Sequence, residues 1–307
     1  MAGLTAAGLL RERGWSVVLL DKGRGVGGRM ATRRMGASRF DHGAQFFTVR
    51  DGRFAEATRR WEEAGWISPW FTQEGHVRYR ATSGMAALAK RLAQGLDVRK
   101  ETKAVSVEIG GAGWRVSTDS GEVFQADALL LTAPAPQCSQ LLCGCADSIP
   151  DDVSAALAAV EYEPCFALLV TLENTASVPS PGYVRPGNGP VEWIADNTQK
   201  GVSEGSPALT IHASAAFSRE HFEADQEHVA RVLLAAANPF LGGKVTDWQL
   251  HRWKYSRPVP GDRPLKLFST APAPLAIRGR RVRRTPGGRR FSIRACGSGD
   301  DREFRLY

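Results

Sequence analysis

The sequence predicts an α/β fold in which a dinucleotide-binding half is interleaved with a β-rich half. A helix over residues 4–13 leads into a short apolar strand over 16–20 and then into a glycine-rich loop over 23–29. Three alternating segments within 104–124 are separated by glycine turns and predict a β-meander. A second continuous apolar strand follows at 128–131, as expected for a strand buried in a parallel sheet.

The other predicted elements come from helical or alternating periodicity. Two amphipathic helices are expected, one that contains Met85 and one earlier in the chain. Another helix is expected directly after Ser218, because serine is a residue type that caps helices. The predicted ranges are helices 54–65, 84–94 and 219–237, and strands 166–173, 208–213 and 248–255.

Composition and charge limit the class of protein. The chain has 307 residues, is 43% hydrophobic and 23% charged, and contains no apolar run of about 18 residues that would span a membrane. Its first residues carry no basic group ahead of the apolar stretch, so no secretory signal is expected and a cytoplasmic location is predicted. The cysteines form no paired spacing, so no metal site is expected.

The net charge of +8 is concentrated at one end. Residues 278–307 contain ten arginines and three acids, a net of +7, which leaves +1 for residues 1–277. A basic segment can bind phosphates, but this one has no interleaved aromatic residue before Phe291. We therefore expect no nucleic-acid partner.

An acidic residue closes the first predicted strand. In dinucleotide-binding folds a carboxylate at a strand end contacts the ribose hydroxyls, while a helix N-terminus faces the pyrophosphate. Asp21 follows Gly3 by about 18 residues, close to the usual spacing of about 20. Asp21 is a candidate ribose ligand, although a surface aspartate in a turn would give the same pattern.

Adjacent glycines follow in the glycine-rich loop. Gly27 and Gly28 precede Arg29 and Met30. Glycine lets the backbone approach a phosphate closely, and a guanidinium pairs with two phosphate oxygens at once. These residues are candidates for pyrophosphate binding, with a flexible turn as the alternative.

The run FDHGAQFF, residues 40–47, combines small and aromatic side chains. A flat ring could lie against the small residues Gly43 and Ala44, and Phe46 and Phe47 could wall a pocket. His42 invites a metal or acid–base role, but no second ligand is near in the sequence, so we expect it to be structural.

Together these motifs resemble the renalase-like group of the FAD-dependent amine-oxidase superfamily. The segments DKGRGVGGRMATRR and FDHGAQFFTVRD carry the resemblance, and later segments extend it over residues 3–277. These segments are Gly84-Met85, 129–142, 161–173, 191–200, 211–220 and 251–258.

The resemblance implies a Rossmann-like FAD-binding domain, incomplete at both ends, interleaved with a mixed β-sheet substrate domain. The predicted FAD-binding domain comprises residues 1–50, 95–150 and 258–277. The predicted substrate domain comprises residues 51–94 and 151–257, and residues 278–307 form an aberrant arginine-rich tail.

The resemblance also implies which residues hold FAD. Those on the ADP side would be Gly3, Asp21, Lys22, Arg29 and Met30, together with the Gly27-Gly28 pair. The backbone of Gly43, Ala44 and Gln45 would lie beside the isoalloxazine ring. Val98 would meet the adenine end, and Thr132, Ala133 and Pro134 would line the cofactor path.

Members of this group oxidise dihydropyridine isomers of NAD(P)H, passing hydride to flavin N5, with molecular oxygen as reoxidant and hydrogen peroxide as product. Such a transfer depends on ring stacking and orientation more than on a strong base, so no catalytic residue is singled out. The candidates for the substrate pocket are Phe46, His212, Trp253 and Tyr255, each of which would also suit a core.

Two alternatives stay open. The first is another FAD amine oxidase or desaturase of the same superfamily, acting on an amine or another small molecule. The second is a non-catalytic flavoprotein remnant that does not hold FAD.

Both ends depart from the pattern of the resembling group. Gly3 can be only the third glycine of G-x-G-x-x-G, so we expect a start inside a longer reading frame. At the other end, a strand begins at Pro274, and residues 278–291 match nothing in the group. If one base was inserted after the codon of Ile277, suitable synonymous codons let the tail be reread in the original frame with a Gly-Asp pair and Arg-Val-Glu-Gly-Ala, so we expect a frameshift there. The nucleotide sequence at that codon tests this expectation.

Overall fold

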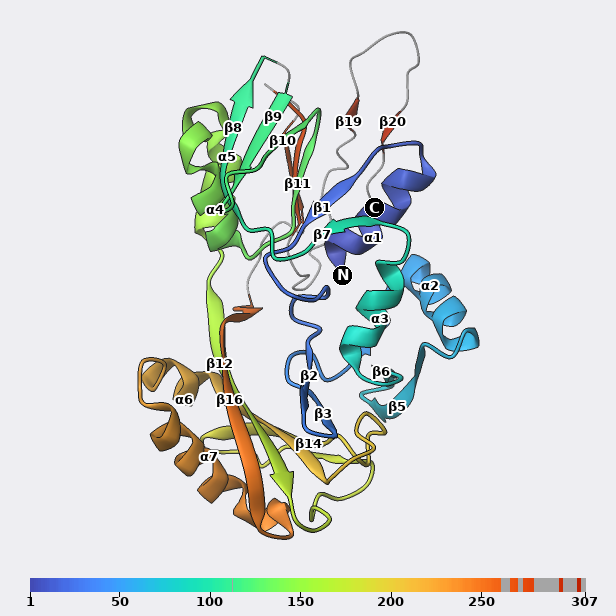
Figure 1. The fold of residues 1–307 in the computed structure, drawn as a ribbon, viewed down its shortest axis with the longest axis vertical. Coiled ribbons are helices and arrows are strands. Elements are labelled where there is room, and N and C mark those ends of the chain that lie inside the picture. The colour runs from blue at the N-terminus through green and yellow to red at the C-terminus, as the bar shows by residue number, and fades with distance from the viewer. Residues whose placement is uncertain (112, 261–265, 270–272, 279–292, 295–302, 305–307) are drawn as a thin grey trace. The chain divides into compact units, whose positions relative to one another are not determined.

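The computed structural model describes residues 1–111, 113–260, 266–269, 273–278, 293–294 and 303–304. Its mixed helices and open sheets confirm the predicted α/β class. The chain forms two compact units that alternate along the sequence (Figure 1). The first unit comprises Met1, Gly25–Gly95 and Glu163–Ser256, and the second comprises Ala2–Arg24, Leu96–Tyr162 and Arg257–Tyr307. The division into an FAD domain and a substrate domain stays a prediction.

The second unit contains the parallel strand pairs expected of a dinucleotide-binding fold. Helix α1 (Ala2–Glu12) precedes β1 (Val18–Leu20), which pairs in parallel with β7 (Asp97–Arg99). In the same way β11 (Leu129–Leu131) pairs in parallel with β18 (Leu275–Arg278). Two strands that pair in parallel need a long connection between them. In this chain the segments that belong to the first unit form part of these connections.

The predicted meander lies in the same unit and is covered by helices. Its strands are antiparallel in the order β10-β9-β8. Val107 and Trp114 from these strands are buried with Cys138 and Leu142. The elements are β8 (Ala104–Gly110), β9 (Gly113–Thr118), β10 (Val123–Ala126), α4 (Ala135–Leu142), the 3-10 helix η1 (Cys143–Ser148) and α5 (Asp151–Ala158).

The remaining strands of this unit lie late in the chain. β17 (Lys266–Ser269) pairs with β18, and β19 (Ile293–Arg294) pairs with β20 (Glu303–Phe304). The strand expected to begin at Pro274 and break at Arg278 includes the backbone of Arg278. The predicted frameshift and tail concern residues that lie mostly outside those described.

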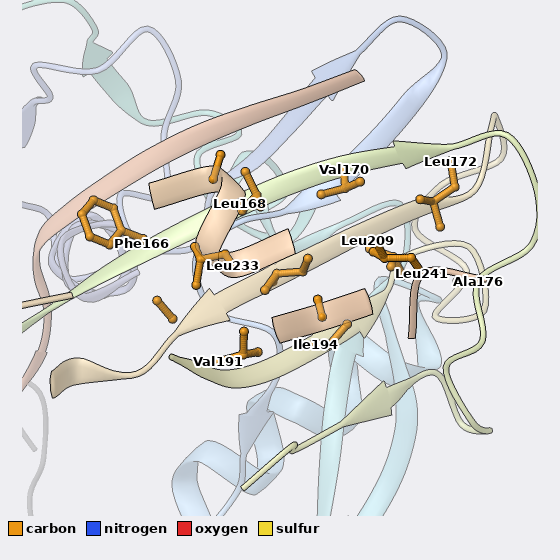
Figure 2. Close-up of a cluster of buried hydrophobic side chains, with 14 of the residues drawn as sticks. Phe166, Leu168, Val170, Leu172, Ala176, Val191, Ile194, Leu209, Leu233 and Leu241 are labelled. Carbon is orange, nitrogen blue, oxygen red and sulfur yellow. The ribbon is translucent and has the colours of Figure 1, made fainter. Parts of the chain in front are cut away.

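A five-stranded sheet with the order β13-β14-β15-β12-β16 forms the centre of the first unit. Phe166, Leu168 and Val170 of β12 point to one face and pack with α7 (Figure 2). Leu169 points to the other face and packs against Phe40. Burial on both faces explains the continuous apolar run. The strands are β12 (Tyr162–Leu172), β13 (Tyr183–Val184), β14 (Val191–Asp196), β15 (Ala208–Ala213) and β16 (Val245–Pro258).

The prediction of one helix over 219–237 is wrong about where the helix begins and about its being continuous. Two helices occupy this region, α6 (Ala215–Glu220) and α7 (Gln226–Leu241). Ser218 is not a cap, because it is buried within α6 and its hydroxyl accepts a hydrogen bond from the Phe166 N–H at 3.2 Å. Ser214 caps α6 and Asp225 caps α7, each through its side-chain oxygen.

A second group of elements in the first unit surrounds the FDHGAQFF segment. The hairpin β2–β3 leads into it, and a three-stranded sheet, β4-β6-β5, follows. Trp61, Ile67, Met85 and Leu88 form the core here. The elements are β2 (Thr32–Met35), β3 (Ser38–Asp41), β4 (Phe47–Thr48), α2 (Gly52–Glu63), β5 (Ile67–Gln73), β6 (His76–Ala81) and α3 (Met85–Leu92).

In the described part of the chain, no helix combines the length and apolar character needed to cross a membrane.

Candidate functional site

Asp21 stands at the end of β1, as the sequence predicted. Its Oδ1 accepts a hydrogen bond from the Gly23 N–H at 2.8 Å. Among the residues that the structure describes, no donor contacts Oδ2, which leaves an acceptor for ribose hydroxyls. Lys22 next to it is exposed.

Gly3 lies against the residue that follows β11. A Cβ on Gly3 would be 3.3 Å from the Thr132 hydroxyl and 3.7 Å from the side chain of Leu19. Ala133 and Pro134 lead from there into α4, with Pro134 as its N-cap. Val98 is paired with Leu19 on the neighbouring strand. The structure thus brings Gly3 and Thr132 together within the second unit.

In the first unit, the paired glycines adopt backbone conformations that other residues resist. Gly27 has a φ of 117° and Gly28 a φ of 55°. The Met30 N–H donates to the Gly27 carbonyl at 3.1 Å, which closes the turn. The Arg29 guanidinium donates to the carbonyl of Ser256 at 3.3 Å, so β16 orients it.

The Gly43-Ala44-Gln45 backbone runs beside this turn. The Ala44 N–H donates to the Arg29 carbonyl at 2.8 Å, and the His42 N–H donates to the Ala31 carbonyl at 3.1 Å. A Cβ on Gly43 would lie 2.0 Å from the Arg29 carbonyl oxygen. Only glycine fits there, and its missing side chain keeps the two segments in contact.

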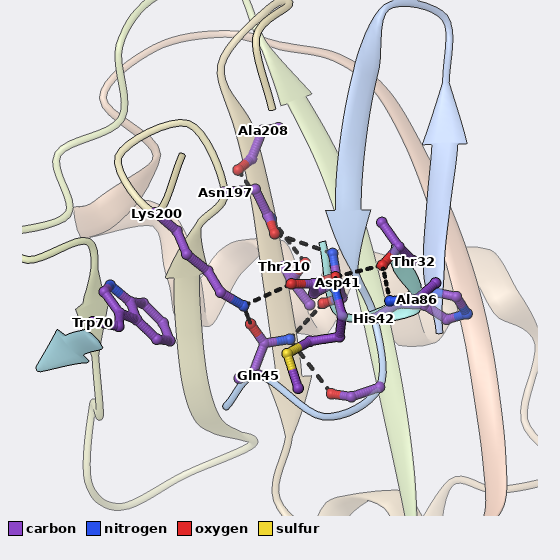
Figure 3. Close-up of polar contacts among 12 residues, drawn as sticks. Thr32, Asp41, His42, Gln45, Trp70, Ala86, Asn197, Lys200, Ala208 and Thr210 are labelled. Carbon is purple, nitrogen blue, oxygen red and sulfur yellow. Dashed lines mark hydrogen bonds and ion pairs between the residues drawn. The ribbon is translucent and has the colours of Figure 1, made fainter. Parts of the chain in front are cut away.

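A buried ion pair holds this loop (Figure 3). The Lys200 ammonium lies 2.8 Å from Asp41 Oδ2, and both side chains are fully buried. Asp41 Oδ1 accepts hydrogen bonds from the Thr32 hydroxyl at 2.6 Å and from the Met85 N–H at 2.8 Å. Asp41 therefore links the lysine to the N-terminus of α3, where a carboxylate is favourable.

Lys200 also contacts the flavin-loop candidate Gln45. Its ammonium donates to Gln45 Oε1 at 3.3 Å, and the Gln45 amide in turn donates to the Asp41 carbonyl. The same ammonium lies 4.7 Å from the centre of the Trp70 ring. Burial lowers the pKa of Lys200, and the neighbouring Asp41 opposes that shift. Each member of the pair thus has an oppositely charged partner and further hydrogen bonds, as a buried ion pair requires.

The sequence prediction missed Asp41 and Lys200. Both stand inside segments that carry the resemblance, but nothing in their local pattern pairs residues 159 positions apart. A buried charge is visible only once the burial of its surroundings is known.

Two predicted pocket residues meet at the carbonyl of His42. The Trp253 indole N–H donates to it at 2.8 Å, and His212 Nε2 lies 3.1 Å from it. The His42 ring stacks on Trp253 with 5.5 Å between centroids. Burial, with a smaller effect from His251, lowers the pKa of His42 to about 3. His42 is therefore neutral at physiological pH and has a packing role.

The other two pocket candidates lie elsewhere in this unit. Phe46 belongs to an aromatic wall, a set of mutually contacting rings that comprises Phe46, Trp70, Phe71, Tyr183 and Trp193. The Arg78 guanidinium lies over the Phe46 ring at 5.5 Å. Tyr255 accepts a long hydrogen bond from Arg29 through its backbone carbonyl, at 3.4 Å. The role of all four in substrate binding stays a prediction.

Two family models match the chain. One, described as flavin containing amine oxidoreductase, matches residues 62–274, and the other, described as NAD(P)-binding Rossmann-like domain, matches residues 1–61. Renalase from Mus musculus is 27% identical over 284 residues, which cover 83% of each chain.

Solved structures share the fold. A putative protoporphyrinogen oxidase from Exiguobacterium sp. has a TM-score of 0.59 at 14% identity and covers 84% of both chains. A putrescine oxidase bound to putrescine has a TM-score of 0.57 at 14% identity and covers 80% of this chain and 81% of the other. A fatty acid isomerase from P. acnes has a TM-score of 0.57 at 13% identity and covers 83% and 84%.

Proposed function

The chain belongs to the flavin-containing amine oxidoreductase family, and on that premise we propose that this FAD-dependent oxidoreductase oxidises a dihydropyridine form of a nicotinamide nucleotide, with molecular oxygen as the final acceptor. When bound, FAD would supply the hydride acceptor, and oxygen would then take the electron pair together with the transferred hydrogen and one solvent proton to form hydrogen peroxide. The renalase-like character of the sequence supports this choice of substrate.

The residues present fit the cofactor. Asp21 offers a carboxylate oxygen to ribose hydroxyls, and Gly27 and Gly28 let the backbone come close to a phosphate. The backbone at Gly43 to Gln45 would face the flavin ring, held in place by Arg29 from one side and by Lys200 from the other. These roles are part of the proposal.

The aromatic wall is the observation that carries the choice of substrate. A dihydropyridine is flat and uncharged, and it gives up hydride without losing a proton to a base, so it needs a stacking surface more than a catalytic acid or base. Tyr183 and Trp193 stack at 4.6 Å and 5° beside Phe46, and the buried Trp193 gives the half-buried rings of the wall a rigid support. A protonated amine would meet the Arg78 guanidinium over Phe46, which favours the dihydropyridine over an amine.

The test uses the protein loaded with FAD. Dihydropyridine isomers of NADH and NADPH, normal NADH and putrescine are each added without oxygen, and the loss of flavin absorbance is followed. We expect bleaching by the isomers, and hydrogen peroxide when air is admitted. Bleaching by putrescine alone would contradict the proposal and favour an amine oxidase. The cytoplasmic location stays a prediction.

A further inference from the structure

A cavity of about 340 Å³ opens in the first unit beside the aromatic wall. Trp70 of β5 and Arg80 of β6 line it, and the other lining residues are Pro69, Ser180, Pro181 and Gln199. This volume suits part of a small-molecule ligand, and the lining combines an aromatic face with polar groups, as ligand pockets do.

Arg80 supplies an uncompensated positive charge to this cavity. Asp41 is the acid that acts on it electrostatically, but Asp41 is already paired with Lys200 at 2.8 Å. Asp41, Lys200 and Arg80 together therefore leave a net charge of +1. Burial lowers the pKa of Arg80, and Asp41 opposes that shift only in part.

The donors of Arg80 have no acceptor among the residues that the structure describes. The carboxylate of Asp196, three residues before the lining residue Gln199, is occupied by the Thr198 and Gln199 N–H groups at 2.8 and 3.1 Å. The backbone makes room for the guanidinium, since a Cβ on Gly201 would lie 2.7 Å from Arg80 Nη1. A half-buried guanidinium without an acceptor is costly, and an oxyanion would satisfy it with two parallel hydrogen bonds.

A second positive charge, the guanidinium of Arg78, lies on the same face of β6 as Arg80. Arg78 stands two residues before Arg80 on β6, so both side chains leave the same face of the strand. Arg78 is only 6% exposed, and its guanidinium donates to the Thr48 hydroxyl at 2.8 Å. Its Nε is buried without a partner in the described part of the chain. One guanidinium, that of Arg78, thus lies over Phe46 of the aromatic wall, and a second, that of Arg80, lines the cavity together with Trp70.

We propose that the Arg80 cavity binds a phosphate group of the substrate, with the guanidinium of Arg80 as its ligand, while the ring of the same substrate lies on the aromatic wall. This rests on the proposed function and assigns the phosphate of its nucleotide substrate to one cavity of the first unit. Free inorganic phosphate shares the chemistry, so the test separates the two sources.

Binding to the full-length protein with FAD is measured by calorimetry with three probes: nicotinamide mononucleotide, nicotinamide riboside and inorganic phosphate. The first two carry the same positively charged pyridinium ring, so the effect of Arg78 on that ring is common to both, and they differ by one phosphate. A charge-assisted, bidentate contact should make the mononucleotide bind about 10- to 100-fold more tightly than the riboside. Arg80→Gln should remove that difference and leave the affinity of the riboside unchanged, whereas Arg80→Lys should restore part of it.

Arg91→Gln is the matched control, because Arg91 is an arginine beside a tryptophan, Trp66, but outside the cavity. It should bind all three probes as the unmodified protein does. Circular dichroism and the flavin spectrum check that each variant folds. Equal affinity for the mononucleotide and the riboside would overturn the proposal. It would also be overturned if Arg80→Gln lowered the affinity for both probes by the same factor. Phosphate binding that depends on Arg80 without any gain for the mononucleotide would also overturn it.

Turnover separates this proposal from the proposed function. With the dihydro forms of both probes, Arg80→Gln should raise KM for the mononucleotide and leave kcat unchanged. If neither dihydro form is oxidised while the binding difference holds, the oxidase proposal fails and the phosphate site stands. If both are oxidised equally well by the unmodified protein, the phosphate site fails and the oxidase proposal stands.

Discussion

A side chain at position 43 would collide with the carbonyl oxygen of Arg29, 2.0 Å from the ideal Cβ. Gly43→Ala must therefore separate the two backbone segments that the Ala44 hydrogen bond holds together. We expect a loss of more than about 2 kcal/mol in the free energy of unfolding, measured in urea, and loss of bound FAD. Gly52→Ala, where no atom lies within 4 Å, should change stability by less than about 1 kcal/mol. Equal stability of the two variants would show that the contact at Gly43 can relax.

His42 makes the stability of the fold depend on pH. Its pKa is about 3 in the folded chain and 6.5 in the unfolded chain, because burial disfavours the charged ring. The unfolded state therefore binds more protons between these values, and stability, complete above pH 6.5, falls as the pH drops toward 3. His42→Phe keeps an aromatic ring against Trp253 and removes the titrating group, so it should flatten the decline.

The measurement for His42 is urea unfolding at several pH values between 4 and 7. The same substitution at the exposed His76 should leave the slope as it is in the unmodified protein. Some slope should persist in His42→Phe, because burial also lowers the pKa of His251. An unchanged slope in His42→Phe would contradict a buried, neutral His42.

Which residues matter was only partly accessible from the sequence. Asp21, Gly27 and Gly43 could be proposed as candidates because their expected chemistry depends on local backbone geometry, which short motifs encode, and their roles stay predictions. Lys200 and Arg80 were missed, because their meaning depends on burial and on partners distant in the chain. Residue identity alone cannot distinguish a buried lysine from a solvated one.

At the scale of elements, the Asp41–Lys200 pair fastens β3 to the segment after β14 and to the start of α3. Lys200→Met would leave a buried carboxylate unpaired, at a cost of about 3–5 kcal/mol in the free energy of unfolding. Adding Asp41→Asn keeps the oxygen that accepts from Thr32 and Met85 but removes the unpaired charge. The double variant should therefore be more stable than Lys200→Met alone.

The comparison uses urea unfolding, with Arg53→Met as the control for an exposed pair. Arg53 lies 3.0 Å from Asp51 at the surface, and its loss should cost less than about 1 kcal/mol. Additive effects of the two substitutions at the buried pair would show that they do not interact. We also expect Lys200→Met to weaken FAD retention, since Gln45 loses its contact with the ammonium.

The periodicity of the sequence predicted which segments are helices and which are strands. It did not predict where these elements end or where a helix is interrupted. The meander was predicted because glycine turns separate strands of alternating pattern. The break between α6 and α7 was not, because the segment reads as one helical pattern and Ser218 has the residue type of a cap. The tertiary contact of Ser218 with Phe166 decides its role, and that contact is not visible in a local window.

At the scale of the whole molecule, the alternation of two units along the chain was predicted from the separation of similar motifs. The apolar segments near residues 20 and 130 were each predicted to be buried parallel strands, and each pairs in parallel with a later strand, in separate sheets. How the segments divide by function stays a prediction, since the fold shared with a putative protoporphyrinogen oxidase and a fatty acid isomerase does not fix a substrate.

The charge of the molecule gives the last prediction. Residues 278–307 contribute +7 of the net +8, so the remaining chain is nearly neutral. Four arginines of this segment, most of which lies outside the described residues, are replaced together: Arg280→Gln, Arg281→Gln, Arg283→Gln and Arg284→Gln. The net charge falls from +8 to +4. Elution from a heparin column should then need less salt, and the slope of log affinity against log salt should fall by up to about 3.

The same column separates this general attraction from the cavity. Arg80→Gln removes one charge from a half-buried position, so its elution from heparin should hardly change, although it abolishes the preference for a phosphorylated probe. The fourfold tail variant should behave in the opposite way, with weaker retention and an unchanged preference. If the tail variant lost the preference for the mononucleotide, the phosphate would be bound by diffuse positive charge, and the structured contact with Arg80 would not be needed to explain it.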